Sequence, residues 1–591
     1  MALRANIRLV LTLVVLGLGL AAVVGRLAWV QVVQRRQILA HSYIDQETLQ
    51  AMNHLLARGV FKPTASGRVA VDQAALALAV PQPDKRRRLL YCAARARLYP
   101  GDKKFDPRLL RVLAPGRRPG RRKVVRGRIL DRLGRPLALS RLDQARGVQR
   151  RYYPLGPAAG HLLGFHHPVF GNHGLEAALD PVLTRHDPSL TGPEPLPGLG
   201  QPRLGTEVRL TIDRDLQKKA FQALDGRPGA VVILDVATGG ILAAVGAPAF
   251  DPNQPDPAAW RAARTRDQGR GLRAKPWEVT YPPGSTFKLV VAAAWLEYKA
   301  RTKLPDPVIM HTGRDPWLRI SDIKAYGRVD LQKALYKSCN VYFARLGVSL
   351  GPAVPAVAAR LGFNRPLELL PTDEGISLVT TPSLAYAAWR YRRRPAGGRG
   401  HVSRRLVKFT TFRRDPKIVA QCAIGQNLVA ATPLQMALVA QAIANRGVLL
   451  LPRLVAGIGN PARRHGYRAQ GPVPGGRVMS RATADTLARA MRLVMTRGTG
   501  RRAGKMFIAG RPLQMAGKTG TAETGRPGEK PHAWFVGFAP AGRPRVAIAV
   551  VLENGGLGSQ NAAPLGVRLL GEALGAQPAQ QAKKNRRGEK S

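Results

Sequence analysis

Two apolar segments joined by a short turn constrain the fold more than any other feature of this 591-residue chain. The segments Ala230–Asp235 and Ile241–Val245 flank Thr238-Gly239-Gly240, and nearly every residue in both is apolar. The turn residues predict a β-hairpin, and strands that lack polar alternation are typical of a sheet covered on both faces. We therefore expect these two strands to lie in the centre of a sheet with other elements packed on each side.

Further strands are expected towards the C-terminus. The segments Leu513–Ala522, Ala533–Phe538 and Val546–Leu552 have the length and composition of strands, whereas Asp213–Leu224 has the pattern of a helix. An order of strands, then helices, then strands again predicts an α+β fold, with an antiparallel sheet flanked by helices.

An apolar run near the amino terminus predicts a membrane segment. Leu9–Gly25 is unbroken by charge, is long enough to span a bilayer and follows Arg4 and Arg8. No small-x-small cleavage site follows it, so we interpret it as an uncleaved anchor, with a cleaved signal peptide as the alternative. If the short amino-terminal tail stays inside, almost the whole chain lies outside the cytoplasm.

The charge of the chain predicts anionic partners without choosing among them. The sequence has 93 Lys and Arg against 36 Asp and Glu, a net charge of +57 that is spread along its length. Nucleic acid, acidic lipid and acidic cell-surface polymer are the candidates, and an extracytoplasmic location argues against nucleic acid. The Arg-rich stretch Trp389–Lys417 is either a solvated basic loop or, by our hypothesis, a contact to acidic lipid or wall polymer.

The cysteines and histidines do not predict a metal or cofactor site. Neither group has the spacing of zinc ligands or of a disulfide framework, and no carboxylate stands at ligand spacing beside the histidines. The residues concerned are Cys92, Cys339, Cys422, His161, His166, His167 and His173. We expect no metal and no cofactor.

The segment Tyr281–Lys288 predicts a nucleophile. Pro282-Pro283-Gly284 breaks any preceding element, and the apolar residues that follow predict a helix with Ser285 in its first turn. Lys288, three residues on, then shares a helix face with Ser285, which places an amine base beside a hydroxyl. A second Ser-x-x-Lys, Ser321–Lys324, lacks the Pro-Gly entry and the apolar helix, so we interpret it as a chance match.

Two later motifs complete an ordered set. Ser338-Cys339-Asn340 follows an amphipathic segment, and Lys518-Thr519-Gly520-Thr521 lies on the first of the late strands; Ser559-Gln560-Asn561 is an accidental copy of the former. Ser-x-x-Lys, Ser-x-Asn and Lys-Thr-Gly in this order are the signature of serine β-lactamases and penicillin-binding proteins.

The chain resembles the class B penicillin-binding proteins, which are membrane-anchored, monofunctional D,D-transpeptidases that crosslink peptidoglycan. The resemblance runs from the anchor, through the pedestal-like segment Arg126–Ala138, to about Gly575, and includes Gly425-Gln426-Asn427 and His532–Phe538. We expect a transpeptidase and serine β-lactamase-like domain, preceded by a β-rich pedestal domain and an N-terminal transmembrane helix. The expected order is a cytoplasmic tail (residues 1–8), a transmembrane anchor (9–30), a basic spacer (31–123), the pedestal (124–186), a linker (187–205), the transpeptidase domain (206–575) and a disordered tail (576–591).

The resemblance also implies roles for individual residues. Ser285 would attack the penultimate D-alanine of a pentapeptide stem, with Lys288 as base and Ser338 as proton relay. Asn340 would bind the substrate amide and orient Lys288.

The Lys-Thr-Gly strand would bind the stem. Lys518 would supply positive charge, Thr519 and Thr521 would bind the terminal carboxylate, and Gly520 would let the substrate backbone approach. The backbone N–H groups of Ser285 and Thr521 would form the oxyanion hole.

The implied partners are pentapeptide stems, β-lactams as covalent inhibitors and a SEDS-type glycan polymerase, because no glycosyltransferase signature precedes the catalytic domain. The implied location is the plasma membrane, crossed once, with the catalytic domain on the extracytoplasmic side. Three alternatives stay open: a β-lactam-hydrolysing or β-lactam-sensing serine protein, a catalytically silent division scaffold, and a nucleic-acid binder.

Overall fold

The structure is a computed structural model of the whole chain, and it divides into two units, residues 1–121 and 122–591. In the first unit it describes only the paired strands β1 (Phe61–Pro63) and β2 (Val69–Val71). In the second it describes residues 124–143, 148–167, 171–184, 203–254, 273–364, 367, 369, 388–391, 404–407, 415–459, 467–468 and 471–578. The predicted anchor, and most of the spacer, of the linker, of the Arg-rich stretch and of the predicted disordered tail, lie outside these residues. The first residues of that tail are ordered, because Gln577–Pro578 form the strand β28, which pairs with Met506–Phe507.

A five-stranded antiparallel sheet forms the centre of the second unit, in the order β12-β11-β27-β26-β25. Its strands are β11 (Gly229–Asp235), β12 (Ile241–Ala247), β25 (Ala516–Ala522), β26 (His532–Ala539) and β27 (Val546–Leu552). All five predicted strands are therefore confirmed. The late strands sit between the hairpin and the sheet edge, which leaves β25 as an edge strand.

Both faces of this sheet are buried, which explains why β11, β12 and β27 are apolar along almost their whole length. Along β11, Val232 and Leu234 belong to one core cluster, and Val231 and Ile233 belong to another. Alternate side chains of a strand point to opposite faces, so each face carries its own core. The first face packs on α19 (Pro433–Ala444), and the second packs on α11 (Arg214–Leu224) and α21 (Ala562–Ala573).

The predicted helix Asp213–Leu224 is confirmed as α11, with Asp213 as its N-cap. The Asp213 carboxylate accepts from the backbone N–H groups of Asp215 and Leu216. This contact satisfies two N–H groups that a helix start leaves unpaired.

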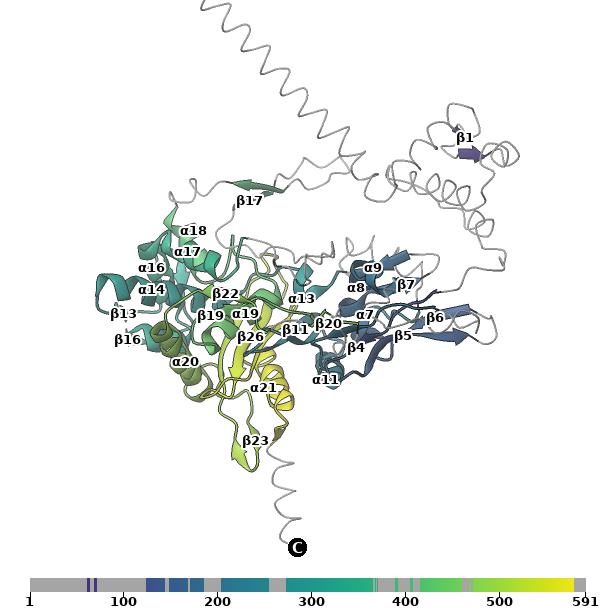
Figure 1. The fold of residues 1–591 in the computed structure, drawn as a ribbon. Coiled ribbons are helices and arrows are strands. Elements are labelled where there is room, and N and C mark those ends of the chain that lie inside the picture. The colour runs from purple at the N-terminus through teal and green to yellow at the C-terminus, as the bar shows by residue number, and fades with distance from the viewer. Residues whose placement is uncertain are drawn as a thin grey trace, which may run out of the picture. The chain divides into compact units, whose positions relative to one another are not determined.

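A helical subdomain lies at one end of the second unit, with the five-stranded sheet between it and the β-rich end (Figure 1). It consists of η3 (Gly284–Phe287), α14 (Lys288–Thr302), α15 (Leu331–Lys337), α16 (Asn340–Leu350), α17 (Ala353–Arg360), α18 (Pro416–Ala423) and α20 (Arg481–Thr496). The second unit also contains short two-stranded sheets: β13 (Ile309–His311) with β16 (Gly327–Val329), β14 (Arg314–Asp315) with β15 (Ile320–Ser321), β17 (Ala388–Tyr391) with β18 (Arg404–Val407), and β19 (Val448–Leu450) with β22 (Pro474–Arg477).

A six-stranded sheet forms the other end, in the order β21-β20-β10-β4-β5-β6. Three of its strands come from the predicted pedestal: β4 (Ile129–Leu130), β5 (Pro136–Asp143) and β6 (Val148–Tyr152). The other three come from later in the chain: β10 (Val208–Leu210), β20 (Val455–Ile458) and β21 (Tyr467–Arg468). The remaining elements are β3 (Val124–Val125), α7 (Pro157–Leu163), β7 (Phe165–His167), β8 (Gly171–His173), α8 (Gly174–Ala178), α9 (Asp180–Thr184), β9 (Arg203–Leu204), α13 (Lys275–Glu278), β23 (Met506–Ile508), β24 (Arg511–Pro512) and β28 (Gln577–Pro578).

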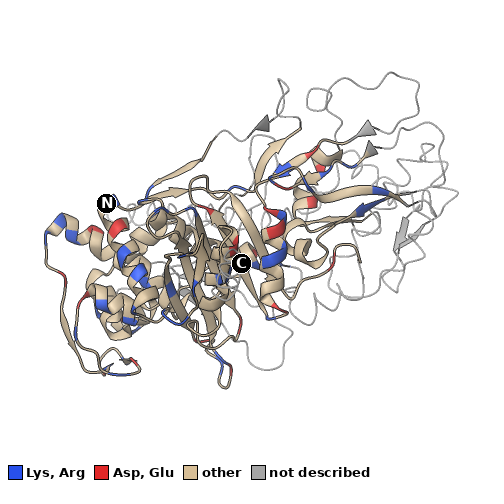
Figure 2. Ribbon diagram, turned by 90° about the horizontal axis from the view of Figure 1, so that it is seen from below, with Lys and Arg blue, Asp and Glu red and all other residues tan. Residues whose placement is uncertain are grey.

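Among the described residues, no single helix is long and apolar enough to cross a bilayer; α16 and α17 would be so only if joined across a 95° bend. Lys and Arg residues are spread over the helices and strands of the described chain rather than gathered on one element (Figure 2). The described surface therefore agrees with a basic charge that is distributed along the sequence.

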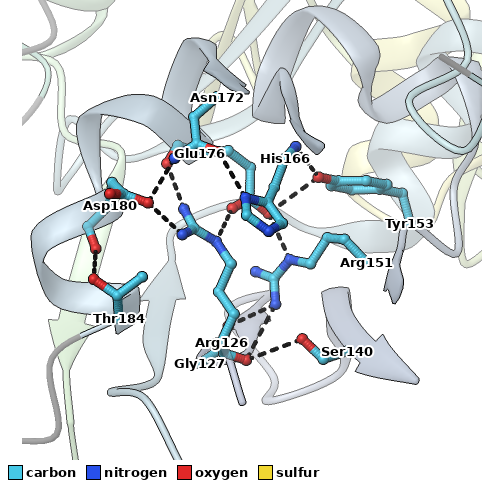
Figure 3. Close-up of polar contacts among 10 residues, drawn as sticks. All are labelled: Arg126, Gly127, Ser140, Arg151, Tyr153, His166, Asn172, Glu176, Asp180 and Thr184. Atoms are coloured by element: carbon cyan, nitrogen blue, oxygen red, sulfur yellow. Dashed lines mark hydrogen bonds and ion pairs between the residues drawn. The ribbon is translucent and has the colours of Figure 1, made fainter. Parts of the chain in front are cut away.

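A buried ionic network holds the β-rich end together (Figure 3). The Glu176 carboxylate, fully buried, accepts from Arg126 Nε at 2.6 Å and from Arg151 Nε at 2.7 Å. Arg126 also binds the Asp180 carboxylate and donates to the Glu176 carbonyl. One carboxylate thus joins β6 and the segment before β4 to α8.

The histidines of this region that were considered as metal ligands contact other side chains. His166 Nδ1 lies 2.6 Å from Asn172 Oδ1, and the backbone N–H of His166 donates to Tyr153 Oη at 2.7 Å. The His173 ring stacks on Phe165. Burial lowers the pKa of His166 and His173, which favours their neutral forms.

We predict that Glu176→Gln destabilises the protein by about 3 to 5 kcal/mol, because it leaves the buried Arg151 guanidinium without its counter-charge and leaves Arg126 paired only with the half-exposed Asp180. Glu207→Gln is the matched control, since Glu207 pairs with Arg128 on the surface, where such pairs contribute about 1 kcal/mol or less. Thermal unfolding followed by circular dichroism measures both. Equal shifts of the two unfolding midpoints would contradict this account.

Candidate active site

Ser285 lies in a 3₁₀ turn, Gly284–Phe287, and the α-helix begins only at Lys288. The sequence prediction placed Ser285 in the first helical turn, so the position is correct and the type of turn is not. Gly284 enters with φ at +52°, a conformation that glycine adopts without steric cost. The Thr286 hydroxyl then donates to the Pro283 carbonyl at 2.7 Å, which closes the turn.

The turn packs against β25 and the loop after α18 at distances that only glycine allows. A Cβ on Gly284 would lie 2.4 Å from the Thr521 carbonyl oxygen, and one on Gly425 would lie 2.0 Å from the Gly284 carbonyl oxygen. The Gly284 N–H donates to the Gly425 carbonyl at 3.0 Å. The three segments are therefore fixed to one another, and half-buried Ser285 is held beside the Lys-Thr-Gly strand.

Lys288 is fully buried, and its amine connects to the second motif. Nζ donates to the Ser338 carbonyl at 2.6 Å and to Asn340 Oδ1 at 2.7 Å, and it lies 3.4 Å from Ser338 Oγ. Burial lowers the pKa of Lys288 to about 8, against the opposing effect of Asp322. With this pKa about a tenth of the amine is neutral at pH 7, against less than a thousandth for an ordinary lysine, and a general base requires the neutral form.

Lys518, on β25, also contacts Ser338. It is fully buried, and Nζ donates to Ser338 Oγ at 2.8 Å and to the Thr519 carbonyl at 2.8 Å. Burial and the neighbouring Lys288 lower the pKa of Lys518 well below its usual value. The hydroxyl of Ser338 therefore connects two amines, and both of their protonated forms are disfavoured.

The conformation of the second motif follows from its place between two helices. Ser338 ends α15 with φ at +61°, and Cys339 is the N-cap of α16. The reversal between the helices turns the Ser338 hydroxyl and the Asn340 amide towards Lys288. Asn340 Oδ1 accepts from Lys288 Nζ at 2.7 Å; that this contact orients the amine stays a prediction.

Asp322 fixes this reversal, and the sequence reasoning missed it by setting Ser321–Lys324 aside as a chance match. Its carboxylate accepts from the N–H groups of Asn340 at 2.7 Å and Val341 at 3.0 Å. The Ser321 carbonyl accepts from Asn340 Nδ2 at 3.0 Å. Neither residue is a nucleophile candidate here; both hold Asn340 in position.

His311 and Cys339 also bond to Asp322, and the three residues offer ligand atoms within 4.8 Å of one another. His311 Nε2 lies 2.9 Å and Cys339 Sγ lies 3.2 Å from Asp322 Oδ2. The Tyr326 N–H donates to His311 Nδ1, so the ring proton is on Nε2 and points to Asp322. These hydrogen bonds use the same atoms that a metal would need, and we assign the group a structural role.

Thr519 and Thr521 already have partners. Thr519 Oγ1 lies 2.5 Å from Thr499 Oγ1, and Thr521 Oγ1 accepts from the Gly558 N–H at 3.3 Å. Thr499, in the loop after α20, is a second residue that the sequence gave no reason to select. A Cβ on Gly520 would lie 2.9 Å from Thr286 Cγ2, so Gly520 is required for packing against the Ser285 turn.

The geometry brings together all three motifs predicted from the sequence. Ser285 forms no side-chain hydrogen bond within the described chain, and Lys288 donates to the second motif rather than to Ser285. The site thus contains the Ser285 hydroxyl, which has no side-chain hydrogen bond among the described residues, together with two buried amines that both contact the Ser338 hydroxyl. This is the arrangement of a serine acyltransferase.

Comparison with known proteins agrees with this chemistry. The model of the penicillin-binding protein transpeptidase domain matches residues 229–571. The chain is 33% identical over 501 residues to the peptidoglycan D,D-transpeptidase PbpA of Mycolicibacterium smegmatis, which covers 79% of this chain and 92% of that protein. The chain belongs to the class B penicillin-binding proteins. It is a serine-type peptidoglycan D,D-transpeptidase.

Solved structures show the same fold. The D,D-transpeptidase domain from Eggerthella lenta matches this class B protein with a TM-score of 0.62 and 30% identity, over 77% of this chain and 99% of that one. Penicillin-binding protein A of M. tuberculosis, as a ceftriaxone acyl-enzyme, matches with a TM-score of 0.61 and 28% identity, over 76% of this chain and 98% of that one.

We predict that the rate of acylation by benzylpenicillin rises about tenfold per pH unit up to the Lys288 pKa of about 8 and is level above it. The sign follows because the protonated amine, which predominates at lower pH, cannot accept the Ser285 proton. Stopped-flow acylation between pH 6 and 10 measures this, with circular dichroism to confirm folding at each pH. A rate that is independent of pH would contradict Lys288 as the base.

Proposed function

We propose that Ser285 is the nucleophile of this transpeptidase. Lys288, Ser338 and Lys518 then accept its proton and pass it to the leaving group. The observation that carries the proposal is the Ser338 hydroxyl, which lies 3.4 Å from Lys288 Nζ and 2.8 Å from Lys518 Nζ, beside the Ser285 turn. Burial destabilises the ammonium forms of both amines. Groups with such shifted pKa values are typical of sites that transfer protons.

In the acylation step, Ser285 Oγ attacks the carbonyl carbon of the penultimate D-alanine, and its proton passes to the neutral Lys288 amine. The oxyanion is bound by the backbone N–H groups of Ser285 and Thr521. Collapse breaks the peptide bond and expels the terminal D-alanine, whose amine receives a proton through Ser338. The neutral amine of a neighbouring stem then attacks the ester carbonyl and loses a proton to Lys288. The ester C–O bond breaks, Ser285 Oγ takes up that proton, and the new amide bond completes the crosslink.

We infer that the stem binds along β25. This strand is last in the order of the described five-stranded sheet, so its outer edge can accept an extended peptide as an added strand. The terminal carboxylate then lies at Thr519 and Thr521. Thr499 fixes the Thr519 hydroxyl from behind, and we propose that it orients this hydroxyl towards the carboxylate.

We propose that the enzyme acts at the plasma membrane, anchored by residues 9–30, with its catalytic domain on the extracytoplasmic side. The apolar run Leu9–Gly25 supports the anchor. Synthesis of the glycan strands falls to a separate polymerase, for which a SEDS-type protein is our candidate, bound through the anchor and the β-rich pedestal. The substrate itself is extracytoplasmic, and this location disfavours a nucleic-acid partner.

Labelling with a fluorescent penicillin tests the nucleophile. We expect a stable covalent label on the wild type and on the matched control Ser321→Ala, and none on Ser285→Ala. Label that decays rapidly would instead support a hydrolase, and absence of label on the wild type would support a silent scaffold.

A carboxylate-free inhibitor tests Thr499. Thr499→Val should slow acylation by benzylpenicillin about tenfold and leave acylation by its methyl ester nearly unchanged, because only the acid needs the oriented Thr519 hydroxyl. Thr499→Ser should restore the acid rate, and Thr496→Val, at an exposed position on α20, is the matched control. Equal loss with acid and ester would show that Thr499 is only structural.

A further inference from the structure

A cavity of about 530 Å³ is lined in part by Pro282, three residues before Ser285. Its walls come from four segments that the fold brings together: Pro282 before the Ser285 turn, Arg319–Ser321 on the β14–β15 hairpin, Gln421 in the last turn of α18 with Ile424, Gln426 and Asn427 after it, and Glu523–Gly525 after β25. The volume lies within the range of ligand pockets, about 300 to 1,000 Å³. None of the roles proposed above uses this cavity.

The position of the cavity defines which part of the stem can reach it. If the terminal carboxylate lies at Thr519 and the scissile carbonyl lies near Ser285 and Thr521, the stem runs antiparallel to β25. It then leaves the site past Glu523. A strand advances about 3.3 Å per residue, so the residue before the two D-alanines is the first whose side chain can enter. That residue is the third of the pentapeptide stem.

The cavity carries two opposite charges that are not neutralised. Arg319 and Glu523 are both exposed at its wall. Within the described chain, neither of them forms an ion pair, with the other or with any third residue. A ligand that fits such a wall carries an anion and a cation of its own.

The hairpin that presents Arg319 is held in place. Arg319 has φ at +54°, in the left-handed region that residues other than glycine rarely adopt. Buried Ile320 follows it, and Asp315 binds both the Leu318 N–H at 2.9 Å and Arg345 Nε at 2.7 Å. Local backbone strain of this kind persists where the surrounding structure enforces it, and it clusters at ligand sites.

We propose that this cavity is the subsite for the third residue of the donor stem, and that it selects a diamino acid whose side chain ends in both an ammonium and a carboxylate. The carboxylate binds Arg319 and the ammonium binds Glu523. A lysine-type side chain, which has no carboxylate, leaves Arg319 without a partner. The inference rests on the proposed roles of Ser285 and Thr519.

Kinetics with paired donors test the subsite. The probes are soluble pentapeptides that end in D-alanyl-D-alanine and carry either meso-diaminopimelate or L-lysine at the third position, and the readout is the kcat/KM for release of D-alanine. We expect the wild type to prefer the diaminopimelate donor about tenfold. Arg319→Ala should abolish the preference by slowing that donor alone, whereas Glu523→Gln should slow both donors.

Arg314→Ala is the matched control, because Arg314 is exposed on β14 of the same hairpin and does not line the cavity. Benzylpenicillin, which lacks the third residue, should acylate all of these variants at the wild-type rate. No preference in the wild type, or equal loss of both donors in Arg319→Ala, overturns the subsite. The subsite is also overturned if the substitutions change only the rate of transfer onto an added acceptor amine. That result would assign the cavity to the acceptor stem.

The same experiment separates this inference from the assignment of the nucleophile. If the wild type is acylated by benzylpenicillin at Ser285 and shows no donor preference, only the subsite is wrong. If benzylpenicillin does not acylate the wild type, the assignment of Ser285 is wrong, and the subsite that rests on it is overturned as well.

Discussion

Two buried lysines that share one serine hydroxyl are the constraint on which the active site depends. Both Nζ atoms of Lys288 and Lys518 lie within reach of Ser338 Oγ, so they are separated by about 6 Å at most. Two ammonium charges at this distance repel by about 3 kcal/mol at an effective dielectric constant near 20, in addition to the cost of burying each one. The pair therefore favours a state with fewer protons than two separate lysines would hold. In the mechanism proposed above, that deficit allows an amine, with an ordinary pKa above 10, to accept a proton from serine.

The rest of the fold serves to keep that unfavourable pair in place. Lys288 comes from the start of α14, Ser338 from the reversal between α15 and α16, and Lys518 from the edge of the five-stranded sheet. If any of these segments could move, the two amines could separate and become hydrated. Glycines at 284 and 425 remove that freedom, because the backbones of the Ser285 turn, the loop after α18 and β25 approach too closely for any side chain to lie between them. The apolar core on the Lys288 side of the sheet then holds the helices against it.

The parts of this structure that could be predicted from the sequence are those with a local signature. Four strands of the central sheet were recognisable from short apolar runs, and Ser285, Lys288, Ser338, Asn340 and Lys518 from motifs of three or four residues, the last of which lies on the fifth strand. Asp322 and Thr499 were not, because each acts through a contact whose partner is distant in the chain and has no fixed spacing. The six-stranded sheet shows the same limit: β10 pairs with β20, and neither strand has a sequence feature that names the other. The role of buried Glu176 likewise depends on Arg126 and Arg151, which are distant in the chain and contact it only in the folded protein.

Recognition of the substrate and alignment of the base share one turn of the chain. Arg319 lines the cavity, Ser321 accepts from the Asn340 amide, and Asp322 accepts from the Asn340 backbone. These residues lie within four positions of one another, and buried Ile320 anchors them to the subdomain. A side chain bound at Arg319 thus stabilises the same turn that positions Asn340, and through Asn340 the Lys288 amine. Binding energy from a part of the substrate that does not react is thereby available to order the reacting groups, which raises kcat rather than only lowering KM.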